Sequence, residues 1–390
     1  MSKQWSDVIL GNYGTPSIEL VSGEGCYVTD SNGRKYLDLL AGIAVSSLGH
    51  SHPALVEAVS NQVATLTHTS NLYANPRARE LAEKLLNLAD MNGKVFFSQD
   101  GATANEAALK LARIWGRANG RTKFISMTNS FHGRTMGALS VTGNPLKREP
   151  FAPFGFDVEF VEYGDIQALQ RACNSSVAAV IVEPIQGEGG VVVPSATFLS
   201  DVRFITRAAG SIMIVDEVQS GIGRTGEWFA SSPVKPDIIT LAKGLAGGMP
   251  LGAMLVDEKY ANVFSPGDHG TTFGGNPVSC AAALAVIETV ESEDLLRNVR
   301  DLSSWFQAAM KETWVPDLIE VRGAGLWFGL VFESHSAQVI EAEARMDGFL
   351  INAVKSNVIR IAPPLNISKR ELQMFVGALP DIVKRAIWAI

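Results

Sequence analysis

Apolar runs of strand length recur through the middle of the chain, and a helical pattern of apolar positions at residues 104–118 follows the first of them. Within each run the apolar residues are continuous, whereas a strand with one face in water would alternate apolar and polar residues. The runs lie at residues 94–98, 123–127, 157–162, 178–184, 211–217, 237–243 and 252–256. Because continuous strands are typical of sheets covered on both faces, the pattern predicts an α/β domain with a largely parallel sheet.

The two flanks of the chain have a different pattern. Residues 21–40 predict a small hairpin with Asn32-Gly33 at its turn, because this dipeptide adopts the backbone that tight hairpins need. After Asn276-Pro277 a long helical pattern begins, and short apolar runs such as VIRIAPP follow. These mixed patterns predict additional α/β structure outside the central sheet.

The length of 390 residues exceeds that of one ordinary domain, so it favours two domains. Hydrophobic residues make up 46% of the chain and charged residues 19%, which suits a large core and leaves little room for disorder. We expect the second, smaller domain to be built from both ends of the chain. The expected division places residues 1–49 and 276–390 in the small domain and residues 50–275 in the large one.

Charge and missing signals exclude several other classes of protein. Lys and Arg sum to 33 and Asp and Glu to 40, and the resulting net charge of −7 argues against nucleic-acid binding. No stretch of about 18 apolar residues is present, so we expect no membrane span. The opening MSKQWSDVIL lacks the pattern of a signal peptide. Three widely spaced cysteines, and no metal-ligand spacing among Cys, His and acidic residues, predict free thiols in the cytoplasm and no metal site.

Three of the expected strands end in residues that can carry chemistry, namely Glu183, Asp216 and Lys243. Ligands of open α/β sheets collect outside the carboxyl ends of the strands, so these side chains are expected around one crevice. A lysine can form a reversible imine with an aldehyde, and an aspartate can keep a pyridine nitrogen protonated. Taken alone, the three residues favour a plain ion pair over a cofactor site.

A ligand that carries a phosphate or a carboxylate group would need a further binding site for each group. The motif SQDGATANEAALKLAR predicts a helix that starts at Gly101, where free backbone N–H groups suit a phosphate. Asp100 would repel a phosphate, so we expect it to cap the helix instead. In FHGRT, Phe131 can stack on a ring and Arg134 can grip a carboxylate, as can Arg360 in VIRIAPP. A solvated surface arginine is the commoner alternative for each.

Together these segments resemble the class III, or ω-, aminotransferases, which are fold-type I enzymes that use pyridoxal 5′-phosphate. The resemblance covers nearly the whole chain and rests most on DEVQSGIGRTG and LAKGLAGGMPLGA; NYGTP and AGIAVSSLGHSHP favour the acetylornithine branch. It implies a large domain with a mostly parallel, seven-stranded sheet, a smaller α/β domain from both chain ends, and a homodimer. One departure is Asp-Gly-Ala-Thr-Ala-Asn at residues 100–105, where the family usually reads Ser-Gly-x-Glu-Ala-Asn.

The resemblance also assigns residues to the cofactor. Lys243 would form the imine with its aldehyde, and Asp216 would pair with the pyridine nitrogen. Phe131 would stack on the ring and Gln219 would bond the 3′-oxygen. The other cofactor contacts that it implies are Gly101, Ala102, Glu217, Val218 and Thr272.

The resemblance assigns the substrate site as well. Arg134 would grip the distal carboxylate, with Thr271 and Thr272 offered by the second subunit. Arg360 would bind the α-carboxylate of glutamate and 2-oxoglutarate, and Glu188 would pair with Arg360 when that carboxylate is absent. The expected catalytic residues are therefore Lys243 and its partners Asp216 and Glu188. The implied reaction transfers the δ-amino group of N-acetylornithine to 2-oxoglutarate, a step of arginine biosynthesis.

Three alternatives are weighed against this prediction. Another class III enzyme could act on succinylornithine, ornithine, 4-aminobutyrate or N-succinyl-diaminopimelate, since the sequence does not define the acyl pocket. A nucleotide-dependent dehydrogenase would need a G-x-G-x-x-G turn directly after the first strand and an acidic residue about 20 positions on, and no such combination follows the first strand. A relative without catalytic activity is disfavoured because Lys243, Asp216, Arg134 and Arg360 are all present.

Overall fold

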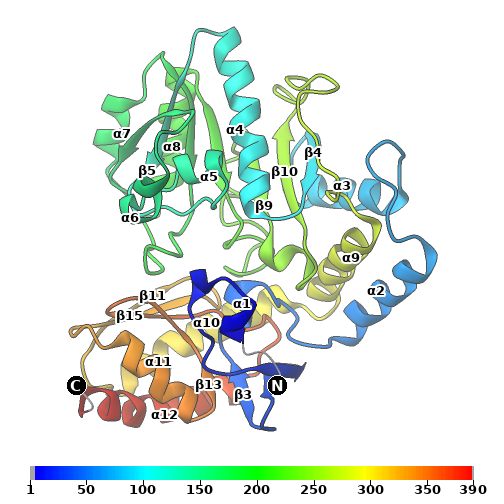
Figure 1. Ribbon diagram of the computed structural model, residues 1–390. Helices are drawn as coiled ribbons and strands as arrows, with labels where there is room; N and C mark the ends of the chain where they lie inside the picture. Colours follow the sequence, from blue (N-terminus) through cyan, green and yellow to red (C-terminus); the bar gives the residue numbers. More distant parts are fainter. Residues whose placement is uncertain (1–4, 389–390) are drawn as a thin grey trace.

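A seven-stranded sheet forms the centre of the molecule (Figure 1). The computed structural model describes residues 5–388, so the first four residues of the opening segment and the last two lie outside the described chain. The strands, in their order across the sheet, are β4 (Gly93–Ser98), β10 (Gly252–Asp257), β9 (Ile238–Leu241), β8 (Ile212–Asp216), β7 (Val177–Val182), β5 (Lys123–Met127) and β6 (Asp157–Val161). Only β10 runs antiparallel to its neighbours, which confirms the predicted, mostly parallel α/β sheet.

Helices cover both faces of this sheet, which explains why its strands are continuously apolar. In β8, Ile212 and Ile214 pack with α4 on one face, whereas Met213 and Val215 pack with α7 and α8 on the other. Successive side chains of a strand point to opposite faces, so a strand between two helical layers needs apolar residues at every position. The covering helices are α4 (Gly101–Ala118), α7 (Ile166–Ala172) and α8 (Phe198–Ala209).

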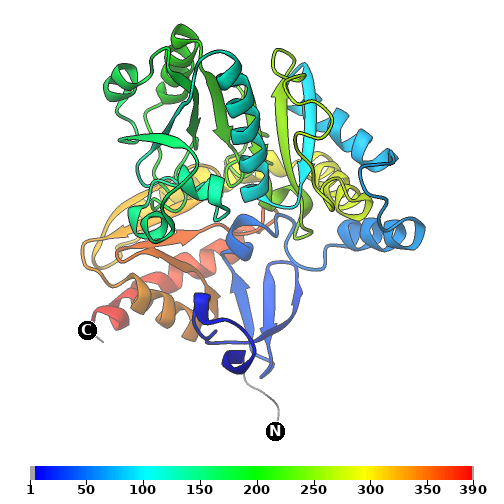
Figure 2. The same ribbon diagram turned by 45° about the horizontal axis from the view of Figure 1, so that its top comes forward.

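Two smaller sheets lie below the central one in Figure 1. The first contains β1 (Leu20–Glu24), β2 (Tyr27–Asp30), β3 (Lys35–Asp38) and β13 (Phe349–Leu350), and the second contains β11 (Leu318–Gly323), β12 (Phe328–Phe332), β15 (Val358–Ile361) and β14 (Asn352–Lys355). The antiparallel pair β2 and β3 confirms the hairpin, and Gly33 in its turn has the positive φ of +81° that glycine allows. Because β13 pairs in parallel with β3, segments from both ends of the chain share one sheet (Figure 2).

Long helices complete the fold around these sheets. The helices α2 (Pro53–Thr65) and α3 (Pro76–Leu88) pack against α9 (Pro277–Ser292), and α10 (Leu295–Glu312), α11 (Ala337–Met346) and α12 (Lys369–Trp388) cover the smaller sheets. The predicted helix after Asn276-Pro277 is confirmed as α9, whose first N–H groups are capped by the Asn276 side chain. The domain boundaries after residues 49 and 275 remain a prediction.

The remaining elements of residues 5–388 are short. These are α1 (Ala41–Ala44), α5 (Met136–Ser140), α6 (Pro145–Arg148) and the 3-10 turns η1 (Trp5–Asp7), η2 (Gly11–Tyr13), η3 (Glu149–Phe151) and η4 (Lys243–Ala246). Within residues 5–388, no helix is long and apolar enough to cross a membrane, and no group of His, Cys, Asp and Glu is arranged to hold a metal ion. All three cysteines are free and buried.

Candidate active site

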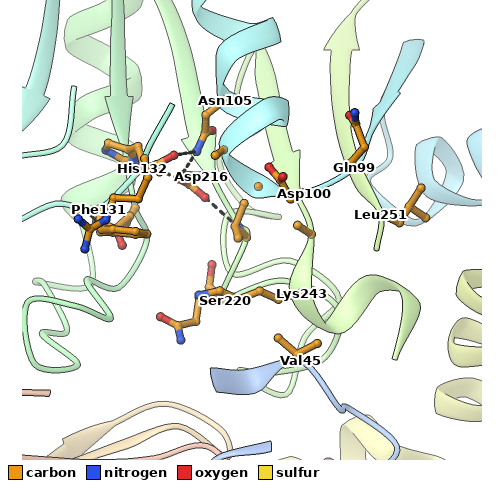
Figure 3. A pocket seen from close by; sticks show the side chains of 18 of the residues that line it. Val45, Gln99, Asp100, Asn105, Phe131, His132, Asp216, Ser220, Lys243 and Leu251 are labelled. Atoms are coloured by element: carbon orange, nitrogen blue, oxygen red, sulfur yellow. Dashed lines mark hydrogen bonds and ion pairs between the residues drawn. The ribbon is translucent and has the colours of Figure 1, made fainter. Parts of the chain in front are cut away.

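A cavity of about 390 Å³ opens at the carboxyl ends of β7, β8 and β9, and Glu183, Asp216 and Lys243 all line it (Figure 3). The three residues are far apart in the sequence, but parallel strands end at the same edge of the sheet. The sequence-based prediction that they surround one crevice is therefore confirmed. Figure 3 shows Lys243 and Asp216 projecting into the same space from neighbouring segments.

Lys243 lies two residues beyond β9 and begins the 3-10 turn η4, so it does not end the strand itself. Its φ of +46° is in the left-handed region, which is strained for a residue with a side chain and is concentrated at functional sites. Burial, followed by the positive charge of Arg360, lowers the pKa of its ammonium to about 8. A lysine with this pKa is partly neutral near physiological pH and can act as a nucleophile or base.

The Asp216 carboxylate is fixed by three groups. Nδ1 of His132 lies 2.8 Å and the Asn105 amide nitrogen 2.7 Å from its Oδ2, and the Val218 N–H donates to its Oδ1 at 3.0 Å. Sequence reasoning assigned no role to Asn105 or His132. His132 directly follows Phe131 in FHGRT, and that neighbourhood is the one signal that could have identified it.

Glu183 is a second buried carboxylate in the cavity wall. It accepts a hydrogen bond of 3.0 Å from the Phe131 N–H. Burial raises the pKa of its carboxyl group well above the usual range, and the negative charge of Asp216 adds to this shift. The direction of this shift favours the protonated form of Glu183.

The start of helix α4 forms one end of the cavity, to which Gly101 and Ala102 contribute. The Asp100 carboxylate accepts a 2.8 Å hydrogen bond from the Thr103 N–H, and the Thr103 hydroxyl accepts one from the Asp100 N–H. Asp100 is thus the predicted N-cap, and its charge is directed into the helix start. A Cβ atom on Gly101 would lie only 2.7 Å from a methyl group of Val218, so glycine is required for this close approach.

The side chains of the segment after β8 point in different directions. Val218 and Gln219 line the cavity, and the Gln219 amide nitrogen is buried with no hydrogen-bond partner in the described chain. Glu217, to which the resemblance assigned a cofactor contact, does not line the cavity. Its carboxylate accepts hydrogen bonds from the Ser220 hydroxyl at 2.5 Å and the Ser231 N–H at 2.7 Å. Consecutive residues at a strand end point to opposite sides, which separates Glu217 from Asp216.

A second charged cluster lies beside the cavity, around Glu188. Nη1 of Arg360 lies 2.8 Å from its Oε1, and Nζ of Lys147 lies 3.3 Å from its Oε2. Arg360 is 2% exposed, and its other terminal nitrogen donates to the Asn352 side chain at 2.8 Å. Burial alone would raise the pKa of Glu188, but the charge and hydrogen bond of Arg360, followed by the charge of Lys147, hold it below its usual value. The predicted pairing of Arg360 with Glu188 is present.

Arg134 also lines the cavity, and it is exposed. Its guanidinium carbon lies 5.5 Å from the centre of the Phe131 ring, and within residues 5–388 no carboxylate pairs with it. Thr271 and Thr272 do not line the cavity of their own chain. Thr271 lies at its rim, where its hydroxyl donates to the Gln99 side chain at 2.9 Å, and Thr272 is exposed.

The residues around the cavity fit pyridoxal 5′-phosphate. Lys243 is a buried, partly neutral amine for the aldehyde, and Asp216 is a restrained carboxylate for the ring nitrogen. The helix start at Gly101 offers N–H groups for the phosphate. The unpartnered amide of Gln219 is an independent sign that a polar ligand belongs here, because buried polar groups are rarely left without a hydrogen bond.

Comparisons with known proteins agree with this arrangement. The family model described as "Aminotransferase class-III" matches residues 11–383. Acetylornithine aminotransferases of Mycobacterium tuberculosis and Streptomyces coelicolor are 49% and 47% identical, covering 100% and 99% of this chain and 97% and 96% of those proteins. The solved structure of an ornithine aminotransferase from Toxoplasma gondii has a TM-score of 0.93 at 31% identity, covering 98% of this chain and 93% of that one. An amine transaminase from an uncultivated Pseudomonas species, solved with pyridoxal phosphate, has a TM-score of 0.90 at 30% identity, and the match covers 99% of both chains. This chain therefore belongs to the class-III aminotransferases.

Proposed function

We propose that this protein transfers the δ-amino group of N2-acetyl-L-ornithine to 2-oxoglutarate, giving N-acetyl-L-glutamate 5-semialdehyde and L-glutamate, and so serves arginine biosynthesis. The observation that carries the proposal is the Arg360–Glu188 pair beside Lys243, because it suits an enzyme with two unlike substrates. The acetylornithine aminotransferases to which the chain is similar support the same substrate. The cofactor is pyridoxal 5′-phosphate.

The bound cofactor supplies a ring that withdraws electrons from the carbon next to the substrate nitrogen. The Asp216 carboxylate keeps the ring nitrogen protonated, and His132 and Asn105 hold that carboxylate in place. Phe131 would stack on the ring, and the N–H groups at Gly101 and Ala102 would hold the phosphate. Gln219 would bond the 3′-oxygen, which would give its amide the partner that it otherwise lacks.

Lys243 performs the proton transfer in this proposal. Its neutral ε-amine would take the proton from the δ-carbon of N-acetylornithine and give it back later in the same half-reaction, while the cofactor would supply the electron acceptor. The lowered pKa suits this task, since the amine must be able to accept and release a proton near neutral pH. In the second half-reaction the same nitrogen moves the proton in the reverse direction.

Two arginines divide the binding of the two substrates. Arg134, which has no carboxylate partner within the described chain, binds the carboxylate far from the reacting carbon in both substrates. N-acetylornithine has no carboxylate near its reacting amine, so Glu188 neutralises Arg360 in that half-reaction. The α-carboxylate of 2-oxoglutarate then displaces Glu188 from Arg360 in the other half-reaction.

We further propose that two subunits form a homodimer in the cytoplasm. Leu72, Tyr73 and Phe273 are 86%, 72% and 60% exposed, and a group of large exposed apolar side chains marks a protein interface. The Asn71 amide bonds the backbone of Thr271, so these apolar residues flank the threonine loop. Such an interface would let Thr272 reach the phosphate bound in the other subunit. Three free, buried cysteines suit a reducing compartment.

The substrate is tested by measuring kcat/KM with 2-oxoglutarate as amino acceptor for N-acetylornithine, succinylornithine, ornithine, 4-aminobutyrate and N-succinyl-diaminopimelate. N-acetylornithine should give the highest value. A tenfold higher value for any of the other four would replace the proposed substrate.

The exchange of Glu188 and the substrate carboxylate on Arg360 is tested separately with Glu188→Gln. A neutral amide leaves the Arg360 charge uncompensated, so we expect the half-reaction with N-acetylornithine to slow by about tenfold or more and that with 2-oxoglutarate to change little. Single-turnover kinetics of each half-reaction provide the measurement. Equal losses in both would contradict the assignment of Glu188.

A further inference from the structure

Glu188 is shared between two cations, and only one of them has a part in the proposed function. Its Oε1 lies 2.8 Å from Arg360 in β15, and its Oε2 lies 3.3 Å from the ammonium of Lys147 in α6. The two contacts use different oxygens, so the carboxylate can leave one cation without leaving the other.

The release of Glu188 from Arg360 creates an electrostatic problem. Its side chain is 27% exposed, so solvent only partly stabilises the charge once the arginine contact is lost. If Arg360 were the sole cation, the incoming α-carboxylate and Glu188 would be two negative charges beside one positive charge. With Lys147 included, two anions face two cations, and repulsion between the carboxylates is offset.

The position of Lys147 is favourable for this compensation. Its Nζ lies 5.3 Å from the centre of the Phe131 ring, so the ammonium is close to two residues that line the cavity, Phe131 and Glu188. Within residues 5–388, Glu188 is the only carboxylate with which Lys147 pairs. Its side chain is 30% exposed and that of Glu188 27%, so solvent only partly screens the attraction between the two charges.

We infer that Lys147 is a positioning residue that retains Glu188 after the α-carboxylate of the dicarboxylic substrate has taken its place on Arg360. The inference rests on the proposed exchange of carboxylates at Arg360. Lys147 favours the 2-oxoglutarate half-reaction in particular, because only that half-reaction displaces Glu188. A merely structural lysine would affect both half-reactions alike.

Lys147→Met tests the inference in the holoenzyme. The KM for 2-oxoglutarate should rise by about fivefold to tenfold, whereas the KM for N-acetylornithine should stay within about twofold. Lys147→Arg keeps the charge and should restore most of the 2-oxoglutarate affinity. The matched control is Lys235→Met, which removes a lysine from a surface ion pair with Asp90 before β9, at the opposite end of that strand from Lys243.

Binding of glutarate, a dicarboxylate that cannot react, gives a readout that does not depend on turnover. Titration calorimetry of the holoenzyme should show a Kd about fivefold to tenfold higher in Lys147→Met. In a Glu188→Gln background the same substitution should change the Kd less than twofold, because no charge remains to be retained. An unchanged Kd in Lys147→Met would overturn the inference, and so would an undiminished effect in the Glu188→Gln background.

These outcomes are distinguishable from a failure of the proposed function. Absence of turnover with N-acetylornithine in the unaltered enzyme would refute the proposed substrate, whatever the glutarate affinities are. Turnover with N-acetylornithine together with equal KM changes for both substrates in Lys147→Met would refute the role of Lys147 alone.

Discussion

The Asp216 carboxylate receives hydrogen bonds from three separate segments of the chain, including one from Asn105 in α4 and one with His132 in the FHGRT loop. A carboxylate held in this way can keep its orientation while the charge on a bound ring changes. The charge and its orientation are two separable properties, and substitutions can remove them one at a time.

Asp216→Asn keeps the size of the side chain but removes the charge that faces the ring nitrogen. We expect kcat to fall by about 10²- to 10³-fold, because a preorganised charge is lost where it acts. His132→Ala leaves the charge but removes one of the two hydrogen bonds to Oδ2, and should lower kcat by about tenfold, as expected for the loss of a hydrogen bond to a charged group. Steady-state kinetics check both, with His335→Ala, an exposed histidine bonded to Ser356, as the control. A larger loss in His132→Ala than in Asp216→Asn would contradict this order.

The pKa of Lys243, lowered to about 8 by burial and by the Arg360 charge, predicts a pH dependence of cofactor loading. Only the neutral amine can attack the aldehyde. The rate should therefore rise about tenfold per pH unit below pH 8 and level off above it. Stopped-flow absorbance after mixing apoprotein with pyridoxal 5′-phosphate provides the measurement.

A control variant tests the cause of that shift. Arg360→Gln removes the nearby positive charge, so the inflection should move to a higher pH. A loading rate that rises without a plateau up to pH 10 in the unaltered protein would contradict the lowered pKa.

At the residue scale, the sequence predicted the position of reactive side chains where they lie at the end of an apolar run. Asp216 ends one buried strand and Glu183 directly follows another, and the carboxyl ends of these strands meet at one edge of the sheet. His132, Asn105 and Lys147 were assigned no role. Their partners are reached through the packing of a loop or helix against a strand end, which no local pattern specifies.

Helix α4 begins with a capping box in which Asp100 and Thr103 satisfy each other's backbone N–H groups. Asp100 thus serves the helix at some cost to the phosphate site, since a negative charge at a helix N-terminus competes with an anionic ligand. The two effects act in opposite directions, so two substitutions at this position should differ in their results.

Asp100→Ala removes the cap and should destabilise the apoprotein by about 1 kcal/mol, visible as a lower urea midpoint. Asp100→Asn keeps the cap and removes the charge, so stability should hold while the Kd for pyridoxal 5′-phosphate falls by about threefold or more. Thr197→Ala is the control, because Thr197 stands at the N-cap position of α8 without making a capping bond. Equal stability of the Ala and Asn variants would contradict the capping role.

At the element scale, the central strands were predictable because two helical layers bury them, and burial on both faces leaves a continuous apolar signal. The pairing of β13 with β3 was not predictable in this way. The strand β13 has two residues and β3 has four, and the two strands lie more than 300 positions apart in the sequence. The reversed direction of β10 is likewise invisible in its composition, since a buried antiparallel strand is as apolar as a parallel one.

At the scale of the whole molecule, a group of large apolar side chains is exposed beside the loop that carries Thr271, as is typical of a protein interface. Leu72 and Tyr73 are exposed beside the loop that carries Thr271, and the ring of Phe273 lies 5.6 Å from that of His68. Phe273→Asp should shift the protein from dimer to monomer in analytical ultracentrifugation, because a charge at the centre of an apolar interface is costly. Trp314→Asp is the control, since Trp314 is also exposed but lies elsewhere. A monomeric mass for the unaltered chain at micromolar concentration would refute the proposed dimer.

Subunit mixing decides which active site Thr272 serves. Lys243→Ala lacks the nucleophile, and Thr272→Asp places a negative charge where the phosphate is expected, so each homodimer alone should be nearly inactive. In a mixed dimer, the site that keeps Lys243 faces Thr272 of the partner subunit, which is intact if the loop acts across the interface. Equimolar exchange should then recover about a quarter of the unaltered activity, because about half of the dimers are mixed and each has one complete site. If Thr272 instead serves its own chain, every site with Lys243 also carries the new aspartate, and no activity returns.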